Sequence, residues 1–535
     1  MGGVNAARIA VGDGGLGVNV LGQLNWMPIR KEEVQEALRE MKKGKAAGSD
    51  GCAVECLKSG GVNIILWMVR LMNLCFHAGK VPEDWTNACI VPLYKGKGDM
   101  RECSNYRGIS LLSVVGKVYG KVLVKRIREG TDDVICEEQA GFRKGRGCVD
   151  QISAVRQLCE KFLAKGKEVF LAFMDLEKAY DRIDREGLWD VLKVYGIGGR
   201  LLEGVKSFYV NSKACVRVGG GVSEYFPVKM GLRQGCVMSP WLFNIYMDGV
   251  VREVNMRVLG QGLNLVSAGG REWKLNQLLF ADDTALVADS EVKLRRLVEE
   301  FGRVCQRRSL KVNVGKSKVM KCSREAGGGH LDIRLNGEPL EKVDSFKYLG
   351  SVIAADGKVE TEVKVRVNEA GRVHGGLRKI LKSRSLHMKV KRKLYEGIVV
   401  PTALYGAETW SMGTAEKRRL NVLEMRCLRS MCGVTRRDRI RNEEIRRRTG
   451  VPRGLAGRAD QCLLRWYGHV ERMEEGSLVK RLMGSDVRGG RLRGRPHLGW
   501  MGCVKRALTE RGMTVEQSRL IVRDRGKWRK LVVSA

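Results

Sequence analysis

The chain has 535 residues, 44% of them hydrophobic, so it can bury a large core and is not a disordered tail. Its 97 Lys and Arg against 60 Asp and Glu give a formal charge of +37, which calls for a polyanionic partner, with nucleic acid as the first candidate. No stretch approaches the length of a membrane span and no signal sequence is recognisable, so we expect an intracellular protein without membrane contact.

The 16 cysteines are scattered along the sequence without a CxxC pair, which favours buried thiols in a reducing compartment. The nearest approach to a metal-binding pattern is formed by Cys427, Cys432, Cys462 and His469. Their spacing fits no zinc module, so dispersed core cysteines are the favoured interpretation.

The N-terminal part predicts a short helical extension. Residues 1–27 carry no periodicity, and we expect them to be poorly ordered. In residues 31–43 apolar positions recur at helical spacing and Gly44 supplies a stop, which predicts a helix followed by a loop over residues 45–51. We therefore assign residues 28–75 to a helical extension.

The central part predicts an α+β body over residues 76–353. From about residue 62 to 350, helical stretches such as residues 64–75, which overlap the extension, alternate with short β-rich runs at residues 169–174 and 278–281, and surface turns are expected around residues 327–329. After about residue 360 the segments become basic and helical. Residues 436–535 hold 26 Lys and Arg against 11 Asp and Glu, which indicates a separate charged module.

Three aspartates are candidates for metal-dependent chemistry. Asp175 ends an apolar strand, where a carboxylate is costly unless it binds something positive. Asp282 and Asp283 lie between two apolar runs, as in the turn of a β-hairpin, although paired aspartates at a turn are also ordinary turn chemistry. Two Mg²⁺ ions that assist nucleotidyl transfer would need such carboxylates, with Asp175 and Asp282 as shared ligands and Asp283 more peripheral.

At these residues the chain resembles the reverse transcriptases of non-LTR (LINE-like) retrotransposons. The resemblance covers roughly residues 45–410 and rests on seven blocks in one order: residues 105–112, 138–147, 173–181, 231–240, 280–283, 310–318 and 346–350. It implies a right-hand polymerase fold with fingers, a palm built on an antiparallel sheet and a helical thumb, the last over residues 354–412. It also implies an RNA template, a DNA primer or target, dNTPs, and two Mg²⁺ ions, with Mn²⁺ as the alternative metal.

The resemblance also implies individual roles. Arg143, Lys144 and Arg146 would hold the triphosphate, or form a solvated basic turn. Tyr180 would exclude a ribose 2′-hydroxyl, and Lys316 would be a general acid for the departing pyrophosphate. The remaining positions are Gln234 and Gly235, which would approach nucleotide or template, and Phe346 and Tyr348, which would grip the primer or fill the core beneath it.

Residues 413–535 are expected to form a basic, mostly helical module that binds nucleic acid. Its basic clusters are residues 436–437, 446–448, 465–469 and 488–495, and Trp466 and Tyr467 beside Arg465 could stack on unpaired bases. A charge-rich solvated face is the alternative interpretation.

The resemblance departs from full-length relatives at two points. Gly108 stands where many relatives carry proline, and residues 1–44 could not form the endonuclease that often precedes the polymerase. The expected function is RNA-directed DNA synthesis, with nuclear localisation as a hypothesis. The rivals are an RNA-dependent RNA polymerase and a catalytically silent, retroelement-derived nucleic-acid-binding protein.

Overall fold

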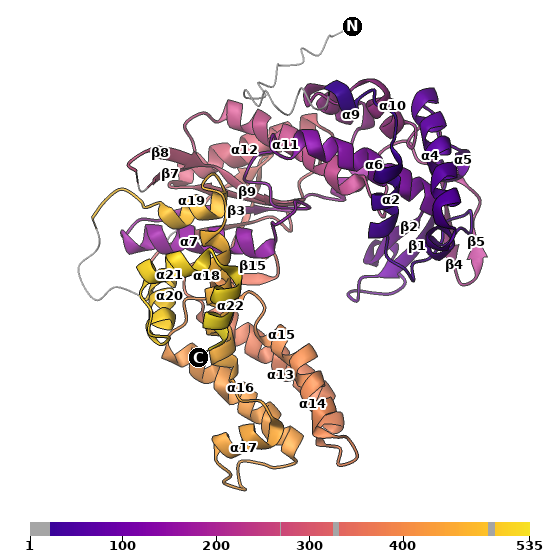
Figure 1. Ribbon diagram of the computed structural model, residues 1–535. Coiled ribbons are helices and arrows are strands. Elements are labelled where there is room, and N and C mark those ends of the chain that lie inside the picture. Colours follow the sequence, from indigo (N-terminus) through magenta and orange to yellow (C-terminus); the bar gives the residue numbers. More distant parts are fainter. Residues whose placement is uncertain (1–21, 268, 325–330, 491–497, 535) are drawn as a thin grey trace.

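The computed structural model describes residues 22–267, 269–324, 331–490 and 498–534, and the turns expected at residues 327–329 lie outside these ranges. Figure 1 shows an upper body of helices and strands, a helical lobe that projects below it, and a group of C-terminal helices against the side of the body. Residues 1–21 are likewise outside the described part. The expected disorder is wrong for residues 22–27, because Asn25 is buried and bonds to Gly196 and Gly198.

The fingers expected from the resemblance combine N-terminal helices with a small sheet. Strands β1 and β2 are antiparallel, whereas β4 joins β1 in parallel and carries the short β5 and β6. The elements are α2 Lys31–Glu40, α3 Val54–Ser59, α4 Gly61–Ala78, α5 Glu83–Thr86, β1 Ala88–Tyr94, β2 Tyr106–Leu111, α6 Val114–Thr131, β4 Lys213–Val218, β5 Gly221–Val222 and β6 Phe226–Pro227.

Helix α4 corrects one expectation from the sequence. By length and composition it is apolar enough to span a membrane, whereas the sequence was expected to contain no such stretch. Its inner side, with Met68, Met72 and Phe76, is buried beside α2 and α10, whereas Trp67 and Leu74 on its outer side are 66% and 68% exposed. The length and composition of a helix do not by themselves separate a core helix from a membrane span.

The palm is a five-stranded sheet in the order β14-β11-β3-β10-β9, antiparallel except between β11 and β14. Strand β3 is central and all six of its residues are buried, so the β-rich run at residues 169–174 is confirmed as a core strand. The strands of the sheet are β3 Val169–Met174, β9 Gln277–Phe280, β10 Asp283–Ala288, β11 Lys318–Cys322 and β14 Glu341–Lys342. Strands β7 Leu263–Val266 and β8 Glu272–Leu275 form a separate antiparallel hairpin.

Helices and smaller strands surround this sheet. Two long amphipathic helices, α7 and α12, contact β3, and their apolar sides are buried in the two main core clusters. These elements are α7 Cys148–Ala164, α8 Ala179–Arg182, α9 Arg185–Val194, α10 Gly199–Lys206, α11 Ser239–Arg257, α12 Glu291–Arg307, β12 Arg334–Leu335, β13 Glu338–Pro339, β15 Ser345–Tyr348 and β16 Ser351–Ala354.

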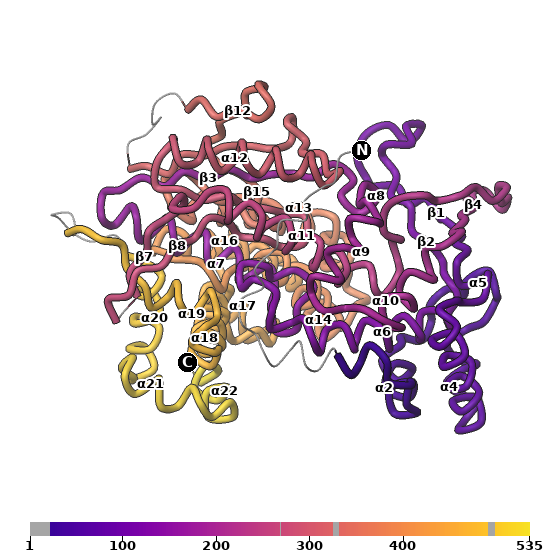
Figure 2. Tube along the Cα trace, turned by 90° about the horizontal axis from the view of Figure 1, so that it is seen from above, coloured from indigo at the N-terminus to yellow at the C-terminus, as the bar shows by residue number. Residues whose placement is uncertain are grey.

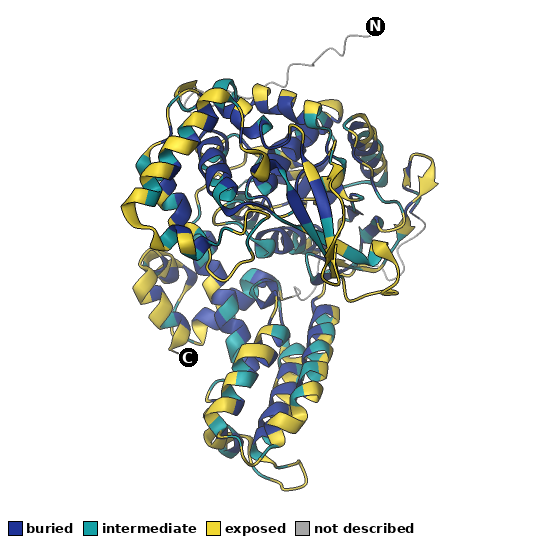
Figure 3. Ribbon diagram, turned by 90° about the vertical axis from the view of Figure 1, so that its right-hand side faces the viewer, coloured by how far each residue is buried: buried dark blue, intermediate teal, exposed yellow. Residues whose placement is uncertain are grey.

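The projecting lobe has its own core, which runs from Val359 to Ala459 and therefore crosses the boundary at residue 412 that we expected between thumb and C-terminal module. Helices α13 and α16 pack against each other, and Figure 3 shows their buried residues turned inward and exposed residues at the far end. The lobe contains α13 Glu360–Lys382, α14 Met388–Leu394, α15 Val400–Ala403, α16 Thr414–Cys432 and α17 Asn442–Thr449.

The C-terminal helices form a fourth core cluster on the side of the palm that is remote from the fingers (Figure 2). They are α18 Leu455–Glu471, α19 Leu478–Gly484, α20 Trp500–Thr509, α21 Val515–Val522 and α22 Arg525–Val533. The described residues thus form an α+β body with a projecting helical lobe and C-terminal helices, consistent with the right-hand architecture that the resemblance implies.

Candidate active site

Asp175 lies directly after the buried strand β3, where the strand emerges from the core. Its backbone N–H donates to Ser317 Oγ at 3.1 Å, and its carbonyl accepts from the Asn313 N–H at 2.8 Å. These two bonds fix the backbone from both sides, so the half-exposed carboxylate projects from a rigid position.

The second and third aspartates lie on the predicted hairpin, which the structure confirms. Strands β9 and β10 pair with Asp283 opposite Phe280, and Ala281 turns the chain with a positive φ of 58°. Strand β10 also pairs with β3, with Thr284 opposite Met174. This register brings the hairpin turn next to the end of β3, so Asp282 and Asp283 lie beside Asp175.

A glutamine that the sequence did not single out holds this turn. Gln139 is 1% exposed, and its Oε1 accepts from the N–H of Ala281 at 3.0 Å and from that of Gly141 at 2.9 Å. Gly141 packs so closely that a Cβ would lie 2.3 Å from the Ala281 nitrogen. The loop before α7 therefore supports the aspartate turn, which no local pattern around Gln139 could indicate.

Desolvation and neighbouring negative charge raise the pKa values of Asp282 and Asp283. Desolvation by the surrounding protein, followed by the charges of Asp282 and Asp175, raises the pKa of Asp283 to about 6. Desolvation is also the largest cause that raises the pKa of Asp282, and Asp175 adds to it. Because both side chains still reach solvent, a cation can enter to relieve this repulsion.

Lys316 lies beside the aspartates as expected. Its Nζ is 3.6 Å from Asp175 Oδ2, and the side chain is 71% exposed. Among the described residues no group of three or more His, Cys, Asp or Glu gathers closely enough to hold a metal ion, and this includes the aspartates as well as the Cys427 region. The aspartates therefore face a common space without forming a closed cage.

Arg107 is a further cation at the site, missed in the sequence analysis although it lies within the block of residues 105–112. It is exposed on β2, and its positive charge acts to lower the pKa of Asp282, against the larger effect of desolvation. A backbone hydrogen bond joins strand β2 to the loop at Gln234, whose carbonyl accepts from the Ser110 N–H at 3.0 Å. Arg107 is thus an exposed cation whose charge acts on the aspartate turn.

The three cations predicted to hold a triphosphate differ in their surroundings. The Arg143 guanidinium is 7% exposed and donates to Asp132 Oδ1 at 2.9 Å and to backbone carbonyls including that of Cys136, so its donors are engaged within the protein. Arg146 is paired with Glu137 at 2.6 Å. Only Lys144 is exposed, and the role predicted for Arg143 is therefore wrong: it holds the loop together.

The expected sugar-contacting residues lie close to Asp181. Tyr180 is partly buried and its ring stacks on Phe243, with centroids 4.6 Å apart and an interplanar angle of 8°. Gln234 Nε2 donates to Asp181 Oδ1 at 3.2 Å. A Cβ at Gly235 would lie 2.7 Å from the Ser110 carbonyl oxygen, so this glycine is required by strand β2.

For the proposed primer grip, the structure favours the second of our two interpretations. Tyr348 is 2% exposed within the core behind the sheet, and Phe346 stacks on Phe173 with centroids 4.2 Å apart. Both rings thus fill the core beneath the site, and Tyr348 has no surface to offer a primer.

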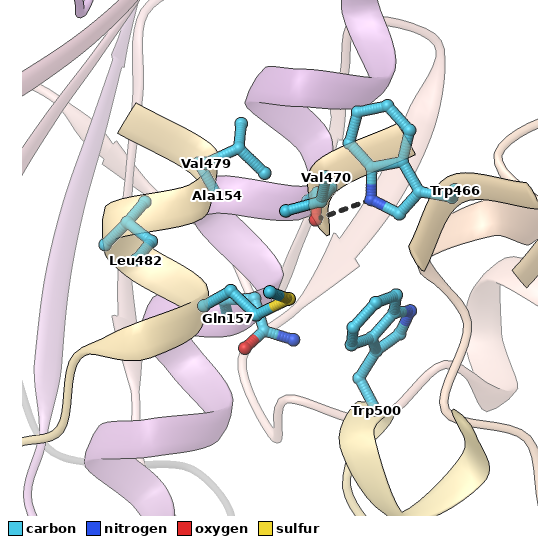
Figure 4. A pocket seen from close by; sticks show the side chains of 9 residues that line it. Ala154, Gln157, Trp466, Val470, Val479, Leu482 and Trp500 are labelled. Atoms are coloured by element: carbon cyan, nitrogen blue, oxygen red, sulfur yellow. Dashed lines mark hydrogen bonds between the residues drawn. The ribbon is translucent and has the colours of Figure 1, made fainter. Parts of the chain in front are cut away.

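The aromatic residues of the C-terminal module are also in the core. Trp466 is 7% exposed and Tyr467 is fully buried, which overturns the prediction that they stack on bases. The Trp466 indole N–H donates to Ser153 Oγ on α7 at 3.3 Å, and Trp500 lies across a small apolar cavity from it (Figure 4). Of the basic clusters, residues 491–495 lie outside the described part.

Comparison with known families gives one match. Residues 95–353 match the family of reverse transcriptases (RNA-dependent DNA polymerases). This span contains the three aspartates, Lys316, Arg107 and both predicted fingers blocks.

Similar proteins are named for mobile elements. A probable RNA-directed DNA polymerase from transposon BS of Drosophila melanogaster is 24% identical over 76% of this chain and 44% of its own length. The RNA-directed DNA polymerase from mobile element jockey of Drosophila funebris gives the same figures, and a Pol polyprotein from a type-1 retrotransposable element R2 of Nasonia vitripennis is 26% identical over 64% of this chain and 32% of its own length. The chain spans less than half the length of each.

Solved structures give weaker similarity. The RNA-dependent RNA polymerase of a human picobirnavirus aligns with a TM-score of 0.43 and 11% identity over 83% of this chain and 75% of its own. Apo telomerase from Candida tropicalis aligns with a TM-score of 0.36 and 13% identity over 55% and 59%.

Proposed function

We propose that residues 95–353, which match the reverse transcriptase family, form a reverse transcriptase domain, and that the protein is an RNA-directed DNA polymerase of the non-LTR retrotransposon type. It would extend the 3′-hydroxyl of a DNA primer on an RNA template with dNTPs. The observation that carries the proposal is the register of β10 against β3, which brings Asp282 and Asp283 beside Asp175 at an open face.

Asp175 and Asp282 would hold two Mg²⁺ ions, or Mn²⁺ in their place, with Asp283 more peripheral. Hard cations prefer carboxylate oxygens, and the pKa values of Asp282 and Asp283 are raised first by desolvation and then by the neighbouring carboxylates, both of which a bound cation would offset. When bound, the ions would lower the pKa of the primer hydroxyl and neutralise the triphosphate. Lys316, now 3.6 Å from Asp175, partly neutralises this carboxylate and would be displaced on binding.

Two exposed cations would act on the triphosphate. Arg107 is exposed on the fingers sheet and has no carboxylate partner in the described part of the chain, so its planar guanidinium is free to donate to phosphate oxygens. Lys316 would donate a proton to the departing pyrophosphate, since its exposed side chain can swing from Asp175 toward the leaving group. Lys144 would add charge at the edge of the site.

Tyr180 would select the sugar. Its stacking on Phe243 holds the ring in one place, so a 2′-hydroxyl could be admitted only by moving a packed aromatic pair. Gln234, whose backbone carbonyl is bound to β2, would contact the nucleotide or the template beside it.

Primer extension tests this proposal. A DNA primer annealed to an RNA template is supplied with Mg²⁺ and either dNTPs or NTPs. We expect extension with dNTPs and at least about hundredfold less with NTPs, because Tyr180 excludes the 2′-hydroxyl. Equal use of NTPs would instead support an RNA polymerase, and template binding without any extension would support the silent binding protein.

A further inference from the structure

A loop over residues 228–236, which we call the supporting loop, packs against the backbone of Tyr180. The Leu232 N–H donates to the Tyr180 carbonyl at 2.7 Å. Gly231 has a positive φ of 79°, and a Cβ at this position would lie 2.7 Å from the Asp181 carbonyl oxygen. The loop backbone therefore lies directly on the segment that carries Tyr180, with no room for a side chain between them.

The ring of Tyr180 also depends on this loop. The loop leads into helix α11, and Ser239 Oγ at the start of that helix donates to the Arg233 carbonyl at 2.8 Å. One turn further along α11, the Phe243 ring stacks on the Tyr180 ring with centroids 4.6 Å apart. The backbone and the ring of Tyr180 thus rest on the supporting loop and on the helix that follows it.

Arg185, the first residue of α9, holds the supporting loop in place. Its guanidinium donates to four backbone carbonyls, those of Val228 at 2.9 Å, Met230 at 3.3 Å, Gly231 at 3.1 Å and Tyr209 at 3.1 Å. Three of these carbonyls belong to the loop. Because the five N–H donors of a guanidinium lie in one rigid plane, a single side chain fixes the relative positions of all four carbonyls.

The surroundings of Arg185 indicate a geometric role rather than charge neutralisation. Its guanidinium has no carboxylate partner among the residues that the structure describes, and it lies over the Tyr209 ring, 5.0 Å from the centroid. By contrast, the guanidinium of Arg182, three residues earlier, is 3.9 Å from the Glu177 carboxylate. A partly buried cation is costly unless its donors are satisfied, and here backbone carbonyls satisfy them.

We propose that Arg185 is a positioning residue for sugar selection, because it fixes the loop on which the backbone and the ring of Tyr180 rest. The inference deepens the proposed function and rests on it, since exclusion of the 2′-hydroxyl by Tyr180 is part of that function. A ring excludes a hydroxyl only as strongly as its surroundings prevent it from moving aside. Loss of the bonds from Arg185 would loosen the loop and let the ring retreat.

The test compares kcat and KM for dNTPs and for NTPs on one DNA primer annealed to an RNA template, with the parent chain and Arg185→Gln. We expect the ratio of dNTP to NTP use to fall at least about tenfold in Arg185→Gln, while kcat for dNTPs stays within about threefold of the parent's. Arg185→Lys keeps the charge without the planar fork and should give an intermediate ratio. It also replaces Arg185→Gln in every comparison if that variant does not fold.

Arg252→Gln is the matched control. Arg252 on α11 is also partly buried and lies over an aromatic ring, 5.9 Å from the Tyr195 centroid. Its bonds go to Asp248 Oδ2 at 2.8 Å and to the Val134 carbonyl, neither of which belongs to the supporting loop. The control should therefore lower Tm and leave the ratio of dNTP to NTP use unchanged. An equal fall in both variants would mean that general loosening of the body explains the effect, and would overturn the proposal.

Hydrogen exchange of peptides that span the supporting loop gives a second readout, which needs no substrate. The Leu232 and Gly231 amides donate to the Tyr180 and Ile183 carbonyls, so their exchange should be at least about tenfold faster in Arg185→Gln and unchanged in Arg252→Gln. Parental exchange in Arg185→Gln, or a parental ratio of dNTP to NTP use, would overturn the proposal. If the parent itself uses both nucleotides equally, the proposed sugar selection fails, whereas the exchange rates still decide whether Arg185 holds the loop.

Discussion

Asp282 and Asp283 are charges that the folded chain holds at a cost to its stability. Their pKa values are raised by desolvation and by the neighbouring carboxylates, in contrast to Asp438, whose pKa is lowered by hydrogen bonds from Thr435. The ionised form of a carboxylate with a raised pKa is stabilised when a cation binds beside it, and an open site lets the cation enter. In the proposed function, binding of a metal ion would offset this cost in stability.

Asp283→Asn should stabilise the metal-free protein at pH 8. The folded pKa of about 6 lies above the unfolded value of about 4, so the charge penalty is complete above pH 6 and absent below pH 4. Because the side chain reaches solvent, the gain is modest, and we expect a rise in Tm of about 1 to 2 °C. Melting curves at pH 8 and pH 4 check this. A gain that persists at pH 4 would mean that the charge is not its cause.

Arg107→Ala should weaken dNTP use. If the guanidinium binds the triphosphate, its loss should raise KM for dNTPs by about tenfold or more, and Arg107→Lys should recover part of the loss. Arg101→Ala is the control, because Arg101 is 90% exposed and paired with Asp99 on the same fingers hairpin. Steady-state kinetics on one primer–template decides. An unchanged KM would remove Arg107 from the substrate site.

At the scale of elements, the β9–β10 hairpin depends on the loop that precedes α7. Gln139 accepts from the Ala281 N–H, and the Asn244 side-chain amide donates to the Gly141 carbonyl at 2.5 Å, so α11, the loop and the hairpin are linked. This connection holds Asp282 at a constant position relative to β3. Gln139 therefore acts as a positioning residue.

Gln139→Met should lower kcat by about tenfold or more, with a smaller effect on KM, because the turn loses its acceptor while the substrate contacts remain. The matched control is Gln157→Met, a buried glutamine on α7 that lies by the cavity of Figure 4 rather than the hairpin. Single-turnover kinetics separates kcat from binding. If both variants lose activity equally, general destabilisation explains the loss and the positioning role fails.

The elements that carry the site could be predicted because their signals are local. The six apolar residues of β3 and the two apolar runs around Asp282 can each be recognised within a few residues of sequence. The buried apolar residues of β10 also determine its register against β3. Arg143 shows the limit of such reasoning. A basic residue in a glycine-rich loop looks the same in sequence whether it binds substrate or its own loop, and only the fold reveals Asp132 beside it.

At the scale of the molecule, the C-terminal helices pack onto the body that carries the five-stranded sheet. Lys161 on α7 donates to the Met483 carbonyl at 3.2 Å, and Val266 exchanges backbone hydrogen bonds with Asp486, which adds a strand-like segment to the β7–β8 hairpin. Trp466 and Trp500 each donate a hydrogen bond to a side chain of α7, Ser153 and Glu160 respectively. The sequence could not indicate this, because Trp466 and Ser153 are more than 300 residues apart.

Trp466→Ala should therefore destabilise the polymerase as a whole. Removing a buried tryptophan costs about 3 to 5 kcal/mol, so we expect a clear fall in Tm and faster proteolysis of α7 and the palm. Trp67→Ala is the control, since that ring is 66% exposed on α4, and it should leave Tm unchanged. Retention of full stability by Trp466→Ala would show that the helices only rest against α7.

The most direct measurement is incorporation of a single dNTP at a DNA primer end on an RNA template, with the parent chain, Asp175→Asn and Asp282→Asn compared at equal duplex occupancy. We expect incorporation by the parent and a loss of about a thousandfold or more in each variant, with duplex binding retained, because both carboxylates would hold the same ions. Incorporation by either variant at a rate close to the parent's would contradict the claim that these aspartates form the polymerase site.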